Sequence, residues 1–498
     1  MKTTGGTVDV VADQHTWRQE AEHRLRGKDW TGAVELLRPR LEAVPVDAQA
    51  WVFLGEALEQ LGDRGSAWAC YERGWILDPP AAWAGRVFAR VGDGRDQPIT
   101  DWVQRLLTVP AVRVMGAILA KDEADNITRC IEALRPAVDG VVVVDTGSSD
   151  ETVALAQAAG ATVVQTTWMD DFGAARQAAE PALGETGWVL WVDADEFLQA
   201  EDVAVPRVVA GLFDQADPPM LLRFVQMNHL GDRVEANYDT TRMFPLGRGI
   251  TWVGRIHEQV VRRSGPGPIQ RASVRIRVDH WGYDHPVVEA RQKYERNIRL
   301  LKAWAADEPN RTAVWGFLGR DLFIAGRVEE AVEALYRAES LASQDPTYAR
   351  TVEVRTVLCE ALVRLNRLEE ARVVAERAVQ GDPTHPAGWY WRAQVALLQA
   401  NDRMTVALES AQKAQATAPQ YRGIVTVSQE MVNFLAPVAE ADALKMQGRW
   451  PEALATYRRA LQVKPDHVGV RRQIQAIEEN ATAVAAARAD QSEQSRQV

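Results

Sequence analysis

The sequence predicts an α/β domain built on a mostly parallel, twisted sheet, with all-α helical repeats before and after it. Three observations lead to this fold class. Residues 111–285 alternate between short apolar runs rich in β-branched residues and stretches with helical spacing. The flanking segments instead repeat small and aromatic residues at a period of about 34 positions. The chain, with 498 residues, is also too long for one ordinary core.

Composition is that of an ordinary globular protein and argues against several classes. Hydrophobic residues make up 46% of the chain and charged residues 25%. The net charge of −11 argues against a sequence-independent nucleic-acid binder. The three cysteines form no C-x-x-C pair, which argues against structural zinc and fits a reducing compartment. Neither a signal peptide nor an apolar run of about 18 residues is visible, so we expect a cytoplasmic protein without a membrane span.

Residues 1–108 contain two helical repeats. Trp17 and Trp51 are 34 residues apart, which is the period of tetratricopeptide (TPR) repeats. Small residues at fixed positions let the two helices of a repeat approach closely, and a proline ends the second helix. The second repeat has the clearer pattern, with Trp51, Leu54, Gly55, Leu58, Ala67, Tyr71 and Pro79 at the characteristic positions.

Residues 301–480 contain about four more repeats of the same kind. Later repeats are weaker, and residues 420–440 are predicted to be an irregular helical insert. We expect the tail, 481–498, to be a frayed helix or disordered, because it has few large apolar residues. The best of these repeats has Trp315, Leu318, Gly319, Leu322, Ala331, Leu335 and Ala338 at the characteristic positions.

Strands and helices alternate in the central domain, which we assign to residues 109–300. A strand-helix order of this kind argues for a parallel sheet with helices on both faces. Such sheets bind ligands beyond the carboxyl ends of their strands. A capping signal at Ser149 is expected to open the second helix. The predicted strands are 112–120, 138–147, 162–168 and 188–197, and the predicted helices are 123–137, 149–161 and 172–182.

Acidic clusters follow three of these strands, and the last cluster, Asp193-Ala194-Asp195-Glu196, is the most informative. Alternate residues of a strand face the same side, so we expect Asp193 and Asp195 to point one way and Glu196 the other. Two carboxylates on one face suit Mn²⁺ or Mg²⁺, which complete their shell with phosphate oxygens and water. The sequence therefore predicts a metal–diphosphate site, with solvated or helix-capping acids as the simpler alternative.

The segments VVVVDTGSSDET, TWMDDFGAARQ and WVLWVDADEF, in this order and spacing, resemble family 2 glycosyltransferases with the GT-A fold. The upstream LAKDEADNI resembles that family's first-strand motif. The similarity is greatest to the bacterial branch in which the transferase domain is joined to TPR repeats. It implies a metal-dependent, inverting, hexosyltransferase-type enzyme that uses a nucleotide sugar, with UDP-sugar favoured. The implied acceptor is a peptide, a protein or a glycan.

The resemblance also implies roles on the donor side. Glu123 and Asp145 match positions that contact the base or ribose. Asp193 matches the acid that faces ribose and metal, and Asp195 matches the direct metal ligand. Arg176 would face the diphosphate or the end of the sheet. The sequence departs from the family pattern at two positions, since Asp122 and Gln177 stand where the family usually has asparagine. Both changes leave the identity of the donor sugar nucleotide open.

On the acceptor side, residues 241–260 and 279–283 resemble two further segments of the family. His257 and Glu258 would lie near the transferred sugar, and His280 would be a third metal ligand unless it is a purely structural histidine. Arg242 would meet the diphosphate or pair with an acid. For the base that takes the acceptor proton, the candidates are Glu258, His257 and Asp239.

Other functions remain as alternatives. A TPR scaffold with a vestigial transferase domain would be expected to lose the acids that follow the strands. A nucleotidyltransferase usually has a Gly-rich, basic loop after the first strand, which LAKDEADNI lacks. A glycosidase needs paired carboxylates but not nucleotide-type strand ends. We expect the repeats to hold the acceptor, bind a partner subunit, mediate homo-oligomerisation, or only brace the catalytic domain.

Overall fold

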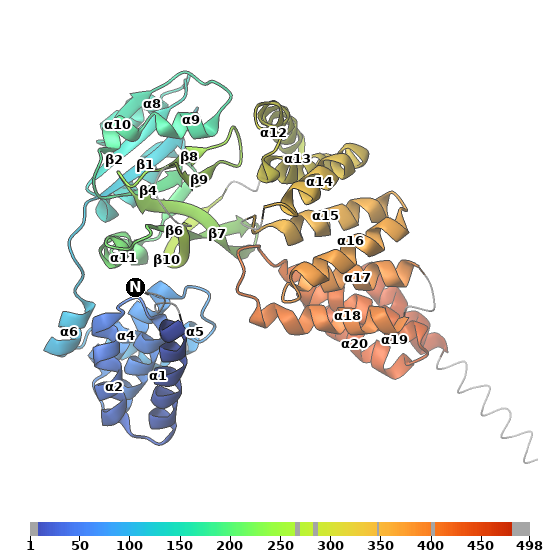
Figure 1. The fold of residues 1–498 in the computed structure, drawn as a ribbon, viewed down its shortest axis with the longest axis horizontal. Coiled ribbons are helices and arrows are strands. Elements are labelled where there is room, and N and C mark those ends of the chain that lie inside the picture. Colours follow the sequence, from blue (N-terminus) through green and yellow to red (C-terminus); the bar gives the residue numbers. More distant parts are fainter. Residues whose placement is uncertain (1–7, 264–268, 282–286, 346–347, 400–403, 481–498) are drawn as a thin grey trace, which may run out of the picture. The chain divides into compact units, whose positions relative to one another are not determined.

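The computed structural model describes residues 8–263, 269–281, 287–345, 348–399 and 404–480. Contacts divide the chain into two units, residues 1–285 and 286–498. The first contains the N-terminal repeats and the sheet, and the second contains the C-terminal repeats (Figure 1). The helix that follows residue 286 therefore belongs to the second unit, although the sequence placed residues up to 300 in the central domain.

Eight strands of the first unit form one mixed sheet in the order β3-β2-β1-β4-β7-β6-β10-β5. The first four strands in sequence, β1 to β4, pair in parallel, as predicted. β7 runs antiparallel to both β4 and β6, and β10 runs parallel to β6. The strands are β1 (Val114–Ala120), β2 (Gly140–Asp145), β3 (Thr162–Gln165), β4 (Trp188–Asp193), β5 (Glu196–Leu198), β6 (Met220–Leu230), β7 (Arg233–Pro245) and β10 (Gln270–His280).

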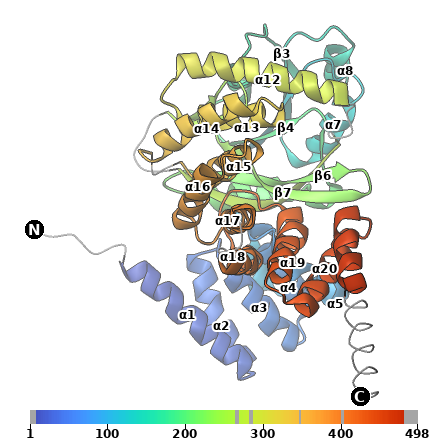
Figure 2. The same cartoon turned by 90° about the vertical axis from the view of Figure 1, so that its right-hand side faces the viewer.

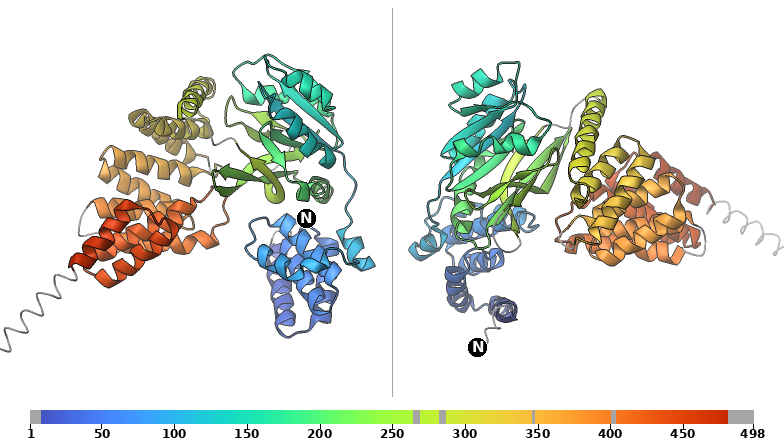
Figure 3. Two further views of the ribbon diagram at one scale, coloured as in Figure 1. Left: turned by 180° about the vertical axis from the view of Figure 1, so that it is seen from behind. Right: turned by 45° about the horizontal axis from the view of Figure 1, so that its top comes forward.

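Helices cover both faces of the sheet (Figures 1 and 3). Side chains of β1 alternate between two cores, with Val114 and Ile118 on one face and Met115 and Ala117 on the other. The first core packs against α7 (Ile127–Leu134), α8 (Thr152–Ala158) and α11 (Val205–Phe213). The second core packs against α10 (Glu180–Leu183) and the short hairpin of β8 (Ile250–Val253) and β9 (Gln259–Arg262).

Two local predictions in this domain are wrong. The helix expected at 172–182 is two helices, α9 (Phe172–Gln177) and α10, because Pro181 occupies the first turn of α10. The helix expected to open at Ser149 begins instead at Thr152, where the side chain of Asp150 accepts from the backbone N–H of Thr152 at 3.0 Å.

The N-terminal repeats are helix pairs whose entry residues are aspartates. Asp29, Asp47 and Asp63 each accept a hydrogen bond from the backbone N–H three residues on. A Cβ at Gly55 would lie 3.0 Å from the ring of Tyr71, which explains why this position needs glycine. The helices are α1 (Val8–Arg26), α2 (Trp30–Ala43), α3 (Ala48–Gln60), α4 (Arg64–Leu77), α5 (Ala84–Val91) and α6 (Asp101–Leu107).

Charged contacts join helix α4 to strand β10 within the first unit. Arg275 of β10 donates to Glu72 at 2.5 Å, lies 3.1 Å from Asp202, and has its guanidinium carbon 4.3 Å from the ring centre of Trp75. The side chain of Asp202 is fully buried and also pairs with Arg277 at 2.8 Å. These N-terminal repeats are therefore packed against the strand that carries His280.

The second unit is a stack of helix pairs (Figure 2). Its helices α14, α16 and α20 begin after Arg327, Arg367 and Arg449, and each arginine pairs with a glutamate three residues on. The insert expected at 420–440 is confirmed as irregular, since it includes a π-helical turn at Met431–Leu435. The helices are α12 (Val287–Asp307), α13 (Thr312–Ile324), α14 (Val328–Ala342), α15 (Thr351–Arg364), α16 (Leu368–Gly381), α17 (Pro386–Leu398), α18 (Met404–Thr417), α19 (Ala436–Met446) and α20 (Trp450–Val463).

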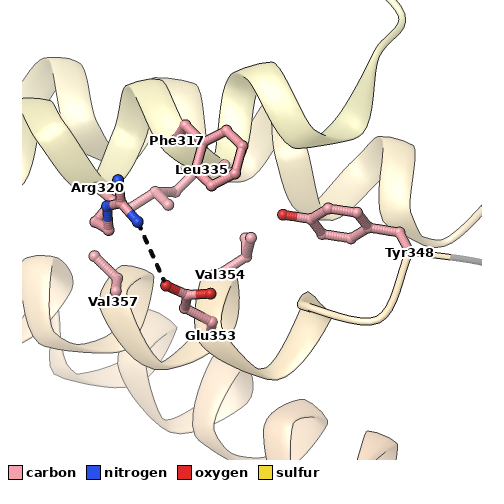
Figure 4. Close-up of a pocket in the computed structure, with 8 residues that line it drawn as sticks. Phe317, Arg320, Leu335, Tyr348, Glu353, Val354 and Val357 are labelled. Atoms are coloured by element: carbon pink, nitrogen blue, oxygen red, sulfur yellow. Dashed lines mark ion pairs between the residues drawn. The ribbon is translucent and has the colours of Figure 1, made fainter. Parts of the chain in front are cut away.

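A small pocket in this unit lies between α13, α14 and α15 (Figure 4). Arg320 and Glu353 face each other across it, 3.9 Å apart, and Tyr348 points its hydroxyl into it (Figure 4). Among the described residues, we find no helix with the length and apolar character needed to cross a membrane. The predicted tail, 481–498, lies outside the described residues.

Candidate active site

The carboxyl ends of β1, β2 and β4 meet at one edge of the sheet. Leu119 of β1 pairs with Asp193, the last residue of β4, and Ala120 pairs with Asp145, the last residue of β2. The predicted convergence of acidic strand ends is therefore present. The loop after β1 adds Glu123 at the same edge.

Hydrogen bonds organise the loops after β1 and β2. Asp145, which is 1% exposed, accepts from the backbone N–H groups of Gly147 at 3.1 Å and Ser148 at 3.2 Å. Asp122 accepts from the backbone N–H and hydroxyl of Ser149 at 2.7 and 3.0 Å. The hydroxyl of Ser148 also donates to Asp145, so its carboxylate is engaged by three donors of its own loop and shapes that loop.

Glu123 lies among other acids. Its carboxylate accepts from the side chain of Asn126 at 3.0 Å, and its backbone N–H donates to Thr152 at 2.7 Å. Burial, together with the charges of Asp195, Asp150 and Asp193, raises the pKa of Glu123. Such mutual repulsion is relieved when a cation or hydrogen-bond donors bind nearby.

Two arginines neutralise Asp193. Its two carboxylate oxygens accept from Arg176 at 2.7 Å and from Arg242 at 2.6 Å. Arg176 also donates to Glu258 at 2.8 Å, and Arg242 lies 3.7 Å from the same carboxylate. We call these four residues the arginine–carboxylate cluster. It joins α9, β4, β7 and the segment before β9, and its formal charges cancel.

Tryptophan rings enclose the buried side of this cluster. The guanidinium carbon of Arg176 is 5.0 Å from the ring centre of Trp191 and 4.8 Å from that of Trp252. Gln177 fixes the Trp252 backbone by donating to its carbonyl at 2.6 Å. Within the described residues, Nη1 of Arg176 and Nε of Arg242 are buried donors without a hydrogen-bond partner. Cation–π contact offsets part of that cost.

The cluster keeps both of its acids ionised. Loss of solvent by itself raises the pKa of Asp193, but Arg242 and Arg176 outweigh it and hold that pKa well below its usual range. Burial likewise raises the pKa of Glu258. The same two arginines lower this pKa by more than burial raises it, so it lies below its ordinary value. Glu258 is therefore arranged to hold Arg176 rather than to take up a proton.

Asp195 does not extend the strand of Asp193. Strand β4 ends at Asp193, residues 194–195 form a turn, and β5 begins at Glu196. The expectation that Asp193 and Asp195 alternate along one strand is therefore wrong. Glu196 is 1% exposed and accepts from the backbone N–H of Asp193 at 2.7 Å. Burial and the charge of Asp193 raise the pKa of Glu196 to about 7.

Asp195 instead meets His280 at the end of β10. Their Oδ2 and Nε2 atoms are 3.3 Å apart. The other ring nitrogen of His280, Nδ1, lies 2.9 Å from Oδ1 of Asn228 on β6. Burial lowers the pKa of His280. The hydrogen bond and the charge of Asp195 raise this pKa by more than burial lowers it, so it lies above its ordinary value.

These contacts reduce the number of predicted metal ligands from three to two. Across the described ranges, no three or more histidine, cysteine or acidic side chains are grouped to hold a metal ion. The reason at this edge is that both oxygens of Asp193 are bound to arginines. Asp195 and His280 supply one carboxylate and one imidazole. That pair fits an Mn²⁺ or Mg²⁺ ion whose other positions are filled by phosphate oxygens and water.

The two remaining acceptor-side candidates are Asp239 and His257, and their surroundings differ. Asp239 on β7 pairs with Arg223 on β6 at 3.6 Å. His257, which lies between β8 and β9, has a left-handed backbone with φ of 49°, a strained conformation for a residue other than glycine. Residues 282–283 of the second acceptor-side segment lie outside the described residues.

Sequence reasoning missed several residues of this site. Asn228 and Gln226 come from β6, where no local motif marks them, and Trp252 of β8 lies in the segment 241–260 but was not singled out. The only available signal was the pairing of amides two residues apart on β6, which places them on one face of the strand.

Comparison with known proteins agrees with this geometry. Residues 117–217 match the model for glycosyl transferase family 2, and residues 18–79 and 358–422 match a tetratricopeptide repeat model. A TPR repeat-containing protein of Synechococcus elongatus is 29% identical over 317 residues, 62% of this chain and 76% of that protein. The SPbeta prophage-derived glycosyltransferase SunS of Bacillus subtilis is 22% identical over 291 residues, 58% of this chain and 68% of SunS.

Shorter or more distant similarities were also found. An uncharacterized glycosyltransferase of Rickettsia felis is 37% identical over 89 residues, 18% of this chain and 31% of that protein. Among solved structures, MamA is 18% identical, with a TM-score of 0.28, over 35% of this chain and 84% of that chain. The matches place a glycosyl transferase family 2 domain at residues 117–217 and tetratricopeptide repeats at residues 18–79 and 358–422.

Proposed function

We propose that the protein is a metal-dependent, inverting glycosyltransferase that moves a sugar from a nucleotide sugar to a peptide, protein or glycan. Among nucleotide sugars, a UDP-sugar is the favoured donor. The observation that carries this proposal is the meeting of Glu123, Asp145, Asp193 and Asp195 at one edge of the sheet. Ligand binding at the carboxyl edge of a parallel sheet is the general rule for such folds.

The donor diphosphate would lie between Asp195 and the arginine–carboxylate cluster. Asp195 and His280 would hold an Mn²⁺ or Mg²⁺ ion, which when bound neutralises charge on the leaving diphosphate. Arg242, whose side chain is 12% exposed, would turn one donor toward the phosphates while Arg176 stays fixed by Glu258. Glu123 and Asp145 would accept hydrogen bonds from the base or ribose.

The acceptor hydroxyl or thiol would attack the anomeric carbon from the face opposite the diphosphate, which inverts that centre. Of the three candidate bases, Glu258 and Asp239 are both paired with arginines. The group that takes the acceptor proton would be one of these three, Glu258, His257 or Asp239.

The repeats would bind a macromolecular acceptor, a partner subunit or a second copy of the chain. The stack of helix pairs itself supports this role, whereas the pocket between α13 and α15 has room for about one water molecule and cannot hold an acceptor segment (Figure 4). TPR stacks commonly bind extended peptides along such surfaces.

A donor screen tests the enzymatic proposal. The protein would be mixed with Mn²⁺ or Mg²⁺ and a panel of nucleotide sugars, and nucleotide release would be followed over time. We expect slow hydrolysis of one donor class that stops when the ion is chelated. Absence of release from every donor would favour the alternative, a TPR scaffold with a vestigial transferase domain.

A further inference from the structure

A short chain of hydrogen bonds connects strand β6 to the proposed metal ligands. Oδ1 of Asn228 lies 2.9 Å from Nδ1 of His280, and Nε2 of His280 lies 3.3 Å from Oδ2 of Asp195. Asn228 is 8% exposed and stands directly opposite His280 in the parallel pairing of β6 with β10. The contact is therefore set by the register of the sheet rather than by a loop.

The chemistry of the amide fixes the state of the imidazole. An amide oxygen only accepts hydrogen bonds, so Nδ1 of His280 must carry the proton in this contact. Nε2 faces Oδ2 of Asp195 at 3.3 Å and donates to it while that nitrogen is protonated, so binding of an ion would replace this proton. Metal-binding histidines are held in this way by a partner on their second ring nitrogen.

The spacing of the two end atoms also suits a shared ion. Two neighbouring ligands of an octahedral ion, each about 2.1 Å from it, are about 3.0 Å apart. Nε2 of His280 and Oδ2 of Asp195 are 3.3 Å apart. At this separation both atoms can lie about 2.1 Å from one ion, with an angle of about 104° between the two bonds.

A second amide on the same strand supports the other ligand. Gln226, two residues before Asn228 and so on the same face of β6, donates to Oε1 of Glu196 at 2.6 Å. The other oxygen of Glu196 accepts from the backbone N–H of Asp193 at 2.7 Å. Gln226 thus stabilises the turn that carries Asp195, while Asn228 orients His280.

We propose that Asn228 is a positioning residue that fixes His280 as an Nε2 ligand beside Asp195, an inference that rests on the metal site of the proposed function. Partners of this kind typically change metal affinity by about 10- to 100-fold. Asn228 itself touches neither the ion nor the substrate, and its effect passes through the orientation and tautomer of one ring.

The first experiment measures Mn²⁺ affinity of the full chain by electron paramagnetic resonance, with saturating UDP. Asn228→Leu removes the acceptor at similar size, and we expect it to weaken Mn²⁺ binding by about 10- to 100-fold. Asn228→Asp keeps an oxygen acceptor, so its affinity should stay close to that of the wild type. His280→Ala sets the effect of losing the ligand entirely.

His229→Ala is the matched control. His229 is the next residue on β6 and points to the opposite face, where it pairs with Asp279 at 2.9 Å and stacks on Trp281. Its loss removes a neighbouring imidazole without touching the chain from Asn228 to Asp195, so Mn²⁺ affinity should be unchanged. Melting temperatures of all variants establish that each is folded.

The second experiment reads the ring with the ion bound. In ¹⁵N spectra of the protein with Mg²⁺ and UDP, His280 should show the pattern of a proton on Nδ1 and none on Nε2 in the wild type and in Asn228→Asp. Asn228→Leu should show the proton on Nε2, directed at Asp195. A wild-type ring that keeps its proton on Nε2 with Mg²⁺ and UDP present would overturn the proposal, because Nε2 would then not hold the ion.

The outcomes distinguish a failure of the role proposed for Asn228 from a failure of the proposed metal site. Unchanged Mn²⁺ affinity in folded Asn228→Leu, with normal binding by the wild type, would overturn only the role of Asn228. Failure of the wild type to bind Mn²⁺ with UDP would overturn the metal site itself and this role with it.

Discussion

Replacing Arg176 by methionine should destabilise the first unit strongly, because Arg176 is the buried centre of the arginine–carboxylate cluster. The side chain of Arg176 is 2% exposed, and it pairs with both Asp193 and Glu258. Breaking a buried ion pair by removing one partner costs about 3–5 kcal/mol. Asp193 is 35% exposed and keeps Arg242, which favours the lower end, about 3 kcal/mol.

Thermal unfolding measures this loss. For a unit of this size, about 3 kcal/mol corresponds to a fall of roughly 5–10 °C in melting temperature. Arg176→Lys keeps the charge but offers no planar fork for two carboxylates, so it should recover only part of the loss. Arg372→Met, which removes a partly exposed arginine paired with Glu369 and Glu376, should change stability by less than about 1 kcal/mol.

Acid dependence gives an independent reading of the same cluster. The folded-state pKa values of Asp193 and Glu258 are lowered, so their stabilisation is fully present above the unfolded pKa values near 4 and is lost as pH falls. The melting temperature should drop between about pH 5 and pH 2, and this drop should be smaller in Arg176→Met. A melting temperature within 1–2 °C of wild type for Arg176→Met, roughly the assay's resolution, would refute the reasoning.

Three further predictions concern individual steps. Asp195→Ala should leave the melting temperature unchanged and cut donor turnover to less than about a tenth, since it removes a direct ligand; a higher residual rate counts against that role. Asp145→Asn should weaken nucleotide binding in calorimetry and lower the melting temperature slightly, because Asp145 also accepts from its own loop; unaltered affinity would reject the nucleotide role. Deletion of residues 315–498 removes most of the C-terminal repeat unit. Transfer to the native acceptor should then fall while donor hydrolysis persists, and an equal fall in both would indicate a bracing role.

The sequence of four parallel strands along the chain was predictable because each is a short run rich in apolar, β-branched residues and bounded by turns. The acids at the strand ends follow directly from that order, since parallel strands end at one edge. Local expectations failed where a few residues decide the outcome. Pro181 starts a new helix, and the chain turns immediately after Asp193.

The partners of Asp193 were not predictable from local patterns. Arg176 and Arg242 are 17 and 49 residues from it, and Glu258 is 82 residues from Arg176. We expected a metal ion to supply the positive charge that balances the acids, with Arg242 either meeting the diphosphate or pairing with an acid. Two arginines supply part of it, because the antiparallel strand β7 brings Arg242 beside β4.

The most direct test of the central claim is anomalous scattering from Mn²⁺ in crystals of the protein grown with UDP. The account predicts one Mn²⁺ peak about 2.0–2.3 Å from a carboxylate oxygen of Asp195 and from Nε2 of His280, with the diphosphate of UDP completing the shell. UDP bound at another surface, or an Mn²⁺ ion coordinated without Asp195, would contradict it.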